Sequence, residues 1–550
     1  TIEVTKIDNI GTPRISKQSV SLSNPSDPFS IVELNIHRRV KDSSFTSVYD
    51  GSNKKWVNTS AEGRVSSVTI NNSESIVESQ VGGYIPSQFT YDTSGRLTAI
   101  IQGARKTRLE YGTNGFLTGI TNPLGQRKSF VNDASGRVLT EMSHDGRETH
   151  FEYDINGNLI SLTPPSRPKH SFLLNTFEEV LEYLPPFIGG TNKTRYIYNI
   201  DNQLQKVLRP DGAMVQYHYL DGRPHVIQAG DTYFFNYSPI YDNYTQVAHS
   251  SGITSDFEFH GPHIKKETQT IASADPVSIE HRFDDEHRVV SSIVRGATTH
   301  SAVSRVYDKD GFLIYNGWAA YQRNDPMGRV TRMTVDNIEA RFTYDSNYGE
   351  LSKIEYRQGS KILYSVNYER DPLGRIVHER KGPFGYAFVY DDAGRLMGRK
   401  EYGDPTWLTR YHYDQNGNRI RVEGPEAPAE LSEYDDQDRI LNNGAGISFV
   451  HNESGERTQR EDVYNVQSTY YSYSRRVTRT LNSVRTARYI YENGLRIAAE
   501  FDESNEVLKR FVYSDGINAP DYMEYMGERY VLIKDVRGSV VKVVNSKSGE

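Results

Sequence analysis

The segment His260-Gly261-Pro262-His263 carries two imidazoles that could share a metal ion. Metal sites in proteins need three or four ligands, and the chain offers this pair no Cys and no clustered carboxylate. A surface turn is therefore the favoured interpretation of the segment. The sequence predicts no metal site and no cofactor.

Carboxylates and tyrosines are the other side chains that could do chemistry. The chain has 71 Asp and Glu residues, so any two could be pictured as the acid and base of a glycoside hydrolase, but their spacing singles out no pair. Its 38 tyrosines could bind sugars by stacking. Their alternation along extended segments favours cross-strand pairing instead, at roughly 0.2 to 1 kcal/mol per pair. We expect no catalytic residue and no enzyme.

The elements that position these residues repeat along the chain. Four segments share one pattern, FTYDTSGRL, LEYGTNGFL, SFVNDASGRV and FEYDINGNL, with glycines at Gly95, Gly115, Gly136 and Gly157. A spacing of 20 or 21 residues marks a repeat architecture. Apolar residues alternate before each glycine, which predicts a β-strand. The Asp-x-x-Gly that follows predicts a tight turn, because Gly accepts positive φ and Asp bonds nearby backbone N–H groups.

A second set of turns lies halfway between these, near Gly103, Gly125 and Gly146. One repeat is therefore two strands and two turns, a hairpin that must stack on its neighbours to be stable. The pattern is clear in 89–159 and returns from Val306, with weaker copies beyond Gly417, and it is worn elsewhere. The residues expected to build the repeat structurally are Tyr91, Asp92, Gly95, Arg96, Tyr153, Asp154, Gly157, Tyr307, Asp308, Gly311, Tyr390, Asp391, Gly394, Arg395, Tyr413, Asp414 and Gly417.

Composition narrows the class of protein. Lys and Arg number 64 against 71 Asp and Glu, a formal charge of −7 with the signs interspersed, so no nucleic-acid partner is expected. No apolar run reaches the ~20 residues of a membrane span, and the absence of Cys excludes a disulfide scaffold. Hydrophobic residues, Tyr included, make up 36% of the chain. That share is low for a solid core of this size, and it favours a wall around a water-filled space.

The recurring Tyr-Asp turn is that of YD repeats, and most of the chain resembles the bacterial Rhs and insecticidal Tc-toxin shells and the animal teneurins, the bacterial branch more closely. The resemblance implies an all-β fold, a large spiral or closed β-shell built as a hollow array of antiparallel hairpins. We expect residues 1–48 to form an irregular N-terminal β segment of the shell and residues 49–550 one continuous body. The prolines near 160–190 mark a plug or a crossing of the wall as an alternative to plain repeats.

Two further segments gain meaning from this resemblance. The C-terminal YVLIKDVRGSVVKVVNSKSGE is similar to the opening of the Rhs-associated core, so the chain is expected to be a piece of a longer polypeptide. Related toxins cut off their C-terminal domain at an Asp-Pro-x-Gly-x-Asp motif. The sequences beginning at Asp325 and Asp371 match its first four positions but lack the final Asp and lie in register with the repeat. They are predicted to be turns.

Three functions compete. The first is a secreted or cell-surface shell that encloses a C-terminal cargo or toxin segment of the same polypeptide. The second is a teneurin-like surface scaffold whose partner is a cell-surface protein or glycan, and the third is a carbohydrate-active enzyme. If the chain is such a shell, its inner wall should be polar rather than a packed apolar layer. The repeat register separately predicts that turn glycines such as Gly394 have positive φ.

Overall fold

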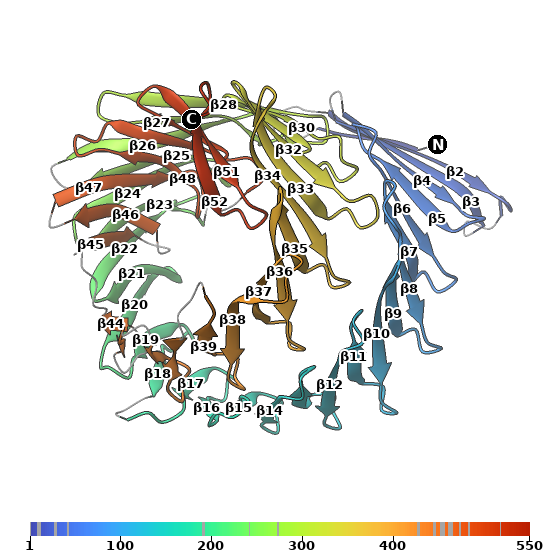
Figure 1. Cartoon of the computed structure of the whole chain (residues 1–550), viewed down its shortest axis with the longest axis horizontal. Coiled ribbons are helices and arrows are strands. Elements are labelled where there is room, and N and C mark those ends of the chain that lie inside the picture. Colours follow the sequence, from blue (N-terminus) through green and yellow to red (C-terminus); the bar gives the residue numbers. More distant parts are fainter. Residues whose placement is uncertain are drawn as a thin grey trace.

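The computed structural model describes the chain except for residues 1, 8–12, 27–29, 41–42, 190–192, 241, 272–273, 426–429, 444–446, 452–456, 460–465, 472–474, 482–483 and 517–518. The described residues form 52 strands and no helix (Figure 1). None of them therefore belongs to a helix able to span a membrane. The prediction of an all-β fold built from antiparallel hairpins is confirmed.

A 40-stranded sheet runs from β1 to β40, and each strand pairs antiparallel with its neighbours in the sequence. We call β1–β27 the first coil: β1 (Ile2–Ile7), β2 (Pro13–Leu22), β3 (Ile31–Val40), β4 (Ser43–Asp50), β5 (Lys55–Thr59), β6 (Val65–Ile70), β7 (Ile76–Val81), β8 (Ser87–Tyr91), β9 (Leu97–Gln102), β10 (Arg105–Tyr111), β11 (Leu117–Thr121), β12 (Arg127–Asn132), β13 (Val138–Met142), β14 (Glu148–Tyr153), β15 (Leu159–Thr163), β16 (His170–Leu174), β17 (Val180–Leu184), β18 (Thr194–Tyr198), β19 (Leu204–Leu208), β20 (Met214–Leu220), β21 (Arg223–Ala229), β22 (Asp231–Tyr237), β23 (Tyr244–His249), β24 (Ile253–His260), β25 (His263–Ile271), β26 (Ala274–Phe283) and β27 (Val289–Arg295).

The second coil continues the wall and ends in two short hairpins, β41–β42 and β43–β44. Its strands are β28 (His300–Tyr307), β29 (Leu313–Asn316), β30 (Ala319–Gln322), β31 (Arg332–Val335), β32 (Ile338–Tyr344), β33 (Leu351–Gln358), β34 (Lys361–Arg370), β35 (Ile376–Lys381), β36 (Phe384–Tyr390), β37 (Leu396–Glu401), β38 (Trp407–Tyr413), β39 (Arg419–Glu423), β40 (Glu430–Leu431), β41 (Glu433–Tyr434), β42 (Ile440–Asn442), β43 (Val450–His451) and β44 (Arg457–Gln459).

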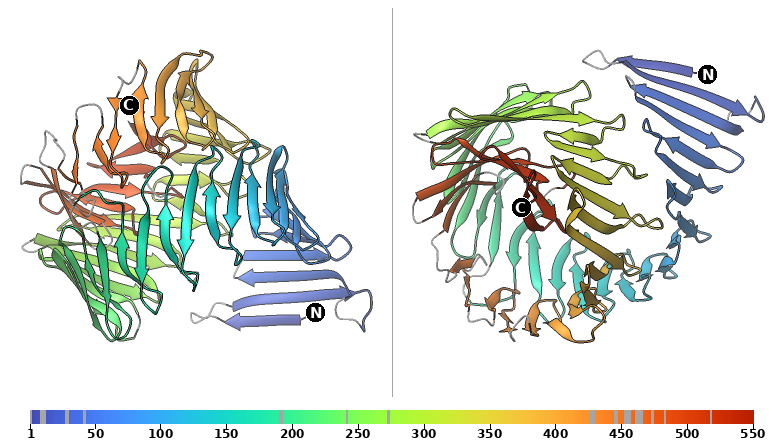
Figure 2. Two further views of the ribbon diagram at one scale, coloured as in Figure 1. Left: turned by 90° about the horizontal axis from the view of Figure 1, so that it is seen from below. Right: turned by 45° about the horizontal axis from the view of Figure 1, so that its top comes forward.

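An 8-stranded sheet, the C-terminal sheet, completes the chain. It consists of β45 (Val466–Tyr471), β46 (Arg475–Leu481), β47 (Val484–Tyr491), β48 (Ile497–Phe501), β49 (Val507–Val512), β50 (Tyr522–Tyr525), β51 (Glu528–Lys534) and β52 (Val540–Asn545). Figures 1 and 2 show the two coils winding as a spiral, with the C-terminal sheet against the inner side of the wall and the N-terminal strands at its outer end.

Each hairpin places its Asp-x-x-Gly turn, the YD turn, at one edge of the wall and its other turn, the plain turn, at the opposite edge. The strands shift register immediately before the YD turn, as between Thr90 and Tyr91 and between Glu152 and Tyr153. Such β-bulges increase the local twist of a strand pair, which helps a long sheet to curl. The wall therefore has a YD-turn edge and a plain-turn edge along its whole length.

The proline-rich region follows the same plan. Residues 160–190 supply β15, β16 and β17, which continue the ladder to β18 with ordinary antiparallel pairing. Pro164 and Pro165 lie in a plain turn, and Pro185 and Pro186 follow β17. Residues 1–48, expected to be irregular, supply long strands that pair in the same sheet.

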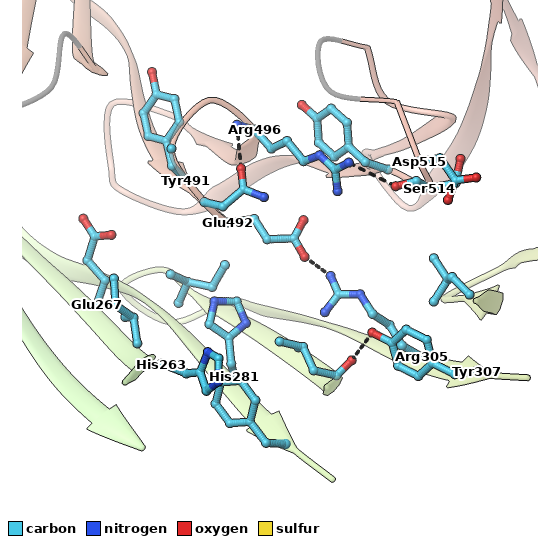
Figure 3. A pocket seen from close by; sticks show the side chains of 18 of the residues that line it. His263, Glu267, His281, Arg305, Tyr307, Tyr491, Glu492, Arg496, Ser514 and Asp515 are labelled. Atoms are coloured by element: carbon cyan, nitrogen blue, oxygen red, sulfur yellow. Dashed lines mark hydrogen bonds and ion pairs between the residues drawn. The ribbon is translucent and has the colours of Figure 1, made fainter. Parts of the chain in front are cut away.

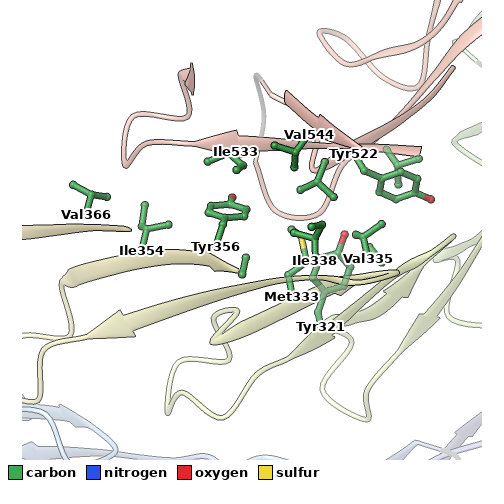
Figure 4. Packing of buried hydrophobic residues seen from close by; sticks show 14 of the residues in the cluster. Tyr321, Met333, Val335, Ile338, Ile354, Tyr356, Val366, Tyr522, Ile533 and Val544 are labelled. Carbon is green, nitrogen blue, oxygen red and sulfur yellow. The ribbon is translucent and has the colours of Figure 1, made fainter. Parts of the chain in front are cut away.

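Among the described residues, the clusters of buried apolar side chains lie where the C-terminal sheet covers the wall, and Figure 4 shows the largest of them. The largest cluster joins Tyr356 and Ile338 of the wall to Tyr522 and Ile533 of the C-terminal sheet. Among described residues before Phe235, Ala99 and Pro186 are the only buried apolar side chains. The rest of the wall is thus a single layer with solvent on both faces.

The accessible surface agrees with this open architecture. It amounts to 29990 Å² for a chain of 62.6 kDa. A compact monomer of that mass exposes about 20,000 Å². The excess follows directly from a one-layer wall, since such a wall buries neither of its faces against a second sheet.

Candidate functional site

The YD turn is a closed hydrogen-bonded unit rather than a reactive site. In the turn at Asp92, the carboxylate oxygen Oδ1 accepts the backbone N–H groups of Ser94 and Arg96 at 2.9 and 3.0 Å. The other oxygen, Oδ2, accepts Nε of Arg96 at 2.8 Å. These bonds lower the pKa of Asp92, against a smaller opposing effect of burial. All three of these hydrogen bonds lie within the turn itself.

Arginine and tyrosine link one repeat to the next. The Arg96 guanidinium lies 4.7 Å from the ring centre of Tyr111, and the Tyr111 hydroxyl donates to the carbonyl oxygen of Leu97 at 2.9 Å. The same stacking joins Arg137 with Tyr153, Arg288 with Tyr307, Arg375 with Tyr390, and Arg395 with Tyr413. Arginine therefore covers one face of each of these rings and ties it to the neighbouring repeat.

The predicted repeat residues therefore lie along the wall and do not converge on one centre. Their glycines have positive φ, namely Gly95 (78°), Gly157 (98°), Gly311 (86°), Gly394 (82°) and Gly417 (96°). Hydroxyl groups of Tyr91, Tyr307, Tyr390 and Tyr413 donate to backbone carbonyls of the preceding repeat.

Both Asp-Pro segments are turns, as predicted. Asp325 accepts the N–H of Met327 at 2.8 Å and Nε of Arg329 at 2.9 Å. Asp371 accepts the backbone N–H groups of Leu373 and Arg375 at 2.9 and 3.0 Å and Nε of Arg375 at 2.7 Å. Neither carboxylate is left free to attack a peptide bond.

A seam joins the two coils edge to edge. Plain turns of residues 60–186 meet YD turns of residues 308–438. Arg105 forms a bidentate pair with Glu350, both bonds at 2.8 Å, and Arg167 bonds Asp414 and Asp438 at 2.8 and 2.9 Å. Further seam contacts are Arg64 with Asp308 and Asp310, Tyr84 with Asp325, Gln126 with Asp392, Arg147 with the carbonyl of Gln415, and Gln437 with the carbonyl of Pro186.

A cavity of about 630 Å³ lies between the wall and the C-terminal sheet (Figure 3). Its titratable lining comes from both layers and includes Glu267, His281 and Arg305 from the wall, and Arg475 and Glu492 from the C-terminal sheet or the turn that follows β47. The sequence separates the two sets by nearly 200 residues, so only the packing of the layers brings them together. Tyr307, Tyr491 and Tyr513 complete an aromatic rim.

The carboxylates of this cavity have contrasting surroundings. Burial raises the pKa of Glu267, against the effect of Arg475, whose Nη1 lies 3.5 Å away, and of the Ser255 hydroxyl. Glu492 instead pairs with Arg305, which also donates to Ser292 at 2.6 Å. Two carboxylates in different environments are a feature of acid–base sites. Here Glu492 forms an ion pair with the buried Arg305, and this structural role is enough to account for its position.

Burial is also the largest influence on the pKa values of the basic groups in the cavity. It lowers the pKa of His281 to about 4, with the charges of Arg305 and Arg510 acting in the same direction, so the imidazole is neutral at physiological pH. Its Nδ1 lies 2.9 Å from the Ser292 hydroxyl. Burial also lowers the pKa of Arg305 to about 10, which leaves it charged.

Of the histidine pair noted in the sequence, His263 lines this cavity. His260 and His263 flank the ring of Phe283, with centroids 5.4 and 5.6 Å away, and His287 comes within 5.7 and 5.8 Å of the two imidazoles. Within the described part of the chain, no group of three His, Cys, Asp or Glu side chains is arranged to hold a metal ion. The rings form an aromatic cluster.

Comparison with known protein families shows to which family the chain belongs. The profile described as Teneurin YD-shell matches residues 19–550. The chain belongs to the teneurin YD-shell family. Mouse Teneurin-4 is 29% identical over 184 residues, covering 31% of this YD shell, and zebrafish Teneurin-3 is 28% identical over 161 residues, covering 26%. The matched part is 6% of each of these relatives.

Solved structures show the same fold at low identity. The Tc holotoxin pore of Photorhabdus luminescens aligns with all of this YD shell at a TM-score of 0.68 and 12% identity, covering 34% of that chain. TcdB2-TccC3 without its hypervariable C-terminal region aligns with a TM-score of 0.69 and 13% identity, again over 100% and 34% of the two chains. This YD shell therefore spans about a third of the structures that it resembles.

The features of the YD shell that sequence reasoning missed are the seam and the second layer. One signal was present for the seam: four of the plain turns carry an arginine, Arg64, Arg105, Arg147 and Arg167, opposite the acidic YD turns. No comparable signal marked the C-terminal sheet, because its strands have the same repeat pattern as the wall that they cover.

Proposed function

We propose that this chain is a non-enzymatic, secreted or cell-surface shell that encloses or carries a C-terminal cargo or toxin segment of its own polypeptide. The observation that carries the proposal is the one-layer wall, whose exposed surface is half as large again as that of a compact protein of its mass. A wall of this kind has no dense core of its own. We infer that its function is to enclose another segment.

The placement of the chain ends supports the same function. In Figures 1 and 2 the chain enters at the outer end of the spiral and finishes with the C-terminal sheet on its inner side. A segment attached after Glu550 would therefore follow the C-terminal sheet on the inner side, whereas β1 lies at the outer end of the spiral.

Two fusions test this difference. A small reporter domain is joined through one flexible linker, with one specific protease site, either after Glu550 or before Thr1, and the rate of cleavage is measured. We expect the C-terminal fusion to be cut at least tenfold more slowly. Acid treatment that unfolds the shell should remove the difference and serves as the control.

Equal cleavage rates for the two fusions would contradict enclosure. The teneurin-like scaffold, with a cell-surface protein or glycan as partner, would then be the function to pursue, and binding of the intact chain to cell surfaces would be measured directly.

A further inference from the structure

The intramolecular seam defines two complementary edges. Its plain-turn side is basic and its YD-turn side is acidic, as in Arg167 with Asp414 and Asp438. The second residue of the YD turn makes several of the contacts: Gln415 accepts from Arg147 through its carbonyl at 2.8 Å, and Pro326 packs so closely that a Cβ on Gly82 would lie 2.3 Å from it. An edge of either type can therefore be recognised by charge and by turn position.

The YD-turn edge of the first coil is not used by this seam and carries an apolar row. Ile155, Phe177 and Ile200 lie on three consecutive YD turns and are 99%, 71% and 102% exposed. Ile155 and Ile200 occupy the second position of their YD turns. In the second coil, residues at this position make contacts of the seam. With strands about 4.8 Å apart, consecutive YD turns are about 10 Å apart, so the row is about 20 Å long.

The plain-turn edge of the second coil carries a matching row. Ile362, Phe384 and Tyr402 lie at three consecutive plain turns and are 54%, 73% and 40% exposed. Isolated exposed apolar residues are common, but contiguous rows mark interaction surfaces. The two rows have the same spacing because both follow the strand repeat.

Charge at two of the three turns of the second-coil row has the same sense as in the seam. Glu178 and Asp201 are exposed beside the first-coil row, and Lys361 and Lys381 are exposed beside Ile362 and Phe384. The turn at Tyr402 carries exposed Glu401 and Asp404 instead, so charge favours the contact at Ile362 and Phe384 only.

We propose that the YD-turn edge around Ile155, Phe177 and Ile200 of one molecule stacks on the plain-turn edge around Ile362, Phe384 and Tyr402 of a second copy. The contact continues between molecules the seam that joins the coils within one molecule. Because the two surfaces differ, the interface is heterologous, and each dimer leaves one edge of each kind free for further copies.

The test is sedimentation velocity on the 550-residue chain over a hundredfold range of concentration. The wild type should show a mass that rises with concentration. Ile155→Ser combined with Ile200→Ser removes one row, and Phe384→Ser weakens the other, so each variant alone should remain a monomer. A 1:1 mixture of the two variants should form dimers and nothing larger, because one intact edge of each kind remains.

Leu495→Ser is the matched control, since Leu495 is 70% exposed but lies outside both rows; it should associate like the wild type. All substituted residues are exposed, and far-UV circular dichroism confirms that the variants fold. A wild type that stays monomeric throughout, association unchanged by the row variants, or a mixture that fails to dimerise would each overturn the proposal.

Discussion

At the scale of the residue, the YD motif is a device for coupling repeats. Asp391 closes its own turn through the backbone N–H of Arg395 at 2.8 Å and its Nε at 2.7 Å. Arg395 then reaches forward, 4.7 Å from the ring centre of Tyr413 and 3.3 Å from the carbonyl oxygen of Asp414. Arginine suits this role because its planar fork can stack and donate at once, which lysine cannot do.

The glycine of the motif can be tested at Gly394. Its φ of 82° disfavours a β-branched side chain, whereas a Cβ there would meet nothing closer than Nη1 of Arg375 at 3.6 Å. Gly394→Val should therefore destabilise through the backbone alone, by about 1 to 3 kcal/mol. Urea denaturation gives the shift in midpoint. Gly83→Val, at an exposed glycine without positive φ, should change stability by less than about 0.5 kcal/mol, and an equal effect of both would contradict the argument.

At the scale of the elements, the two kinds of contact differ in chemistry. Coil meets coil through ion pairs and hydrogen bonds between turns. Wall meets C-terminal sheet through apolar clusters together with ion pairs such as Arg305–Glu492 and Arg529–Asp336. The seam should therefore depend on charge, and the layered region on packing as well as charge. Each can be perturbed by one substitution.

Arg167→Met tests the seam. It leaves Asp414 and Asp438 facing each other without their shared cation, at a cost of about 1.5 to 3 kcal/mol to local seam stability. Hydrogen exchange should accelerate in the turns at 164–167 and 414–418. Arg127→Met removes an exposed pair with Glu110 inside one sheet and should alter exchange little. Equal effects of the two variants would deny the seam a special role.

Acid should open the same seam. Burial opposes ionisation of Asp414, but hydrogen bonds from Asn418 and the charge of Arg167 outweigh it and lower the pKa. A carboxylate with a lowered folded-state pKa stabilises above its unfolded pKa of about 4, and that contribution is lost as pH falls through the folded value. Exchange in the turns at 414–418, corrected for its intrinsic pH dependence, should accelerate below about pH 4. Acceleration of exchange between pH 7 and 8 instead would contradict this prediction.

The layered region depends on packing. Phe501 is fully buried against Val277, Ile279 and Val294 of the wall. Phe501→Ala should lower the free energy of unfolding of this region by about 3 to 5 kcal/mol. Differential hydrogen exchange of β48 reports it, with Leu495→Ala, at a 70% exposed site, as the control. A small effect would mean that the C-terminal sheet is held by its polar contacts.

At the scale of the whole molecule, the single-layer wall predicts an expanded particle. A compact 550-residue domain has a radius of gyration of about 24 Å. Small-angle scattering should give a clearly larger value, because mass lies in the wall away from the centre. A value at or below that figure would contradict a hollow shell and with it the container function.

The sequence by itself determined the hairpin. Period-two alternation, Asp-x-x-Gly chemistry and the 20 to 21 residue spacing specify local strands and turns, because each acts within a few residues, as at Asp92 and Gly95. The sign of φ at Gly394 was predictable for the same reason. The all-β class and the family followed from the recurrence of that unit.

Only the tertiary structure decided how the wall winds and what it touches. Whether Arg105 meets Glu350 depends on small increments of twist summed over more than twenty strands, which no local pattern encodes. The packing of Phe501 on Val277 likewise required a second sheet with the same repeat pattern to leave the wall and fold back over it. Both the seam and the charged cavity at Glu267 and Glu492 arise from that winding.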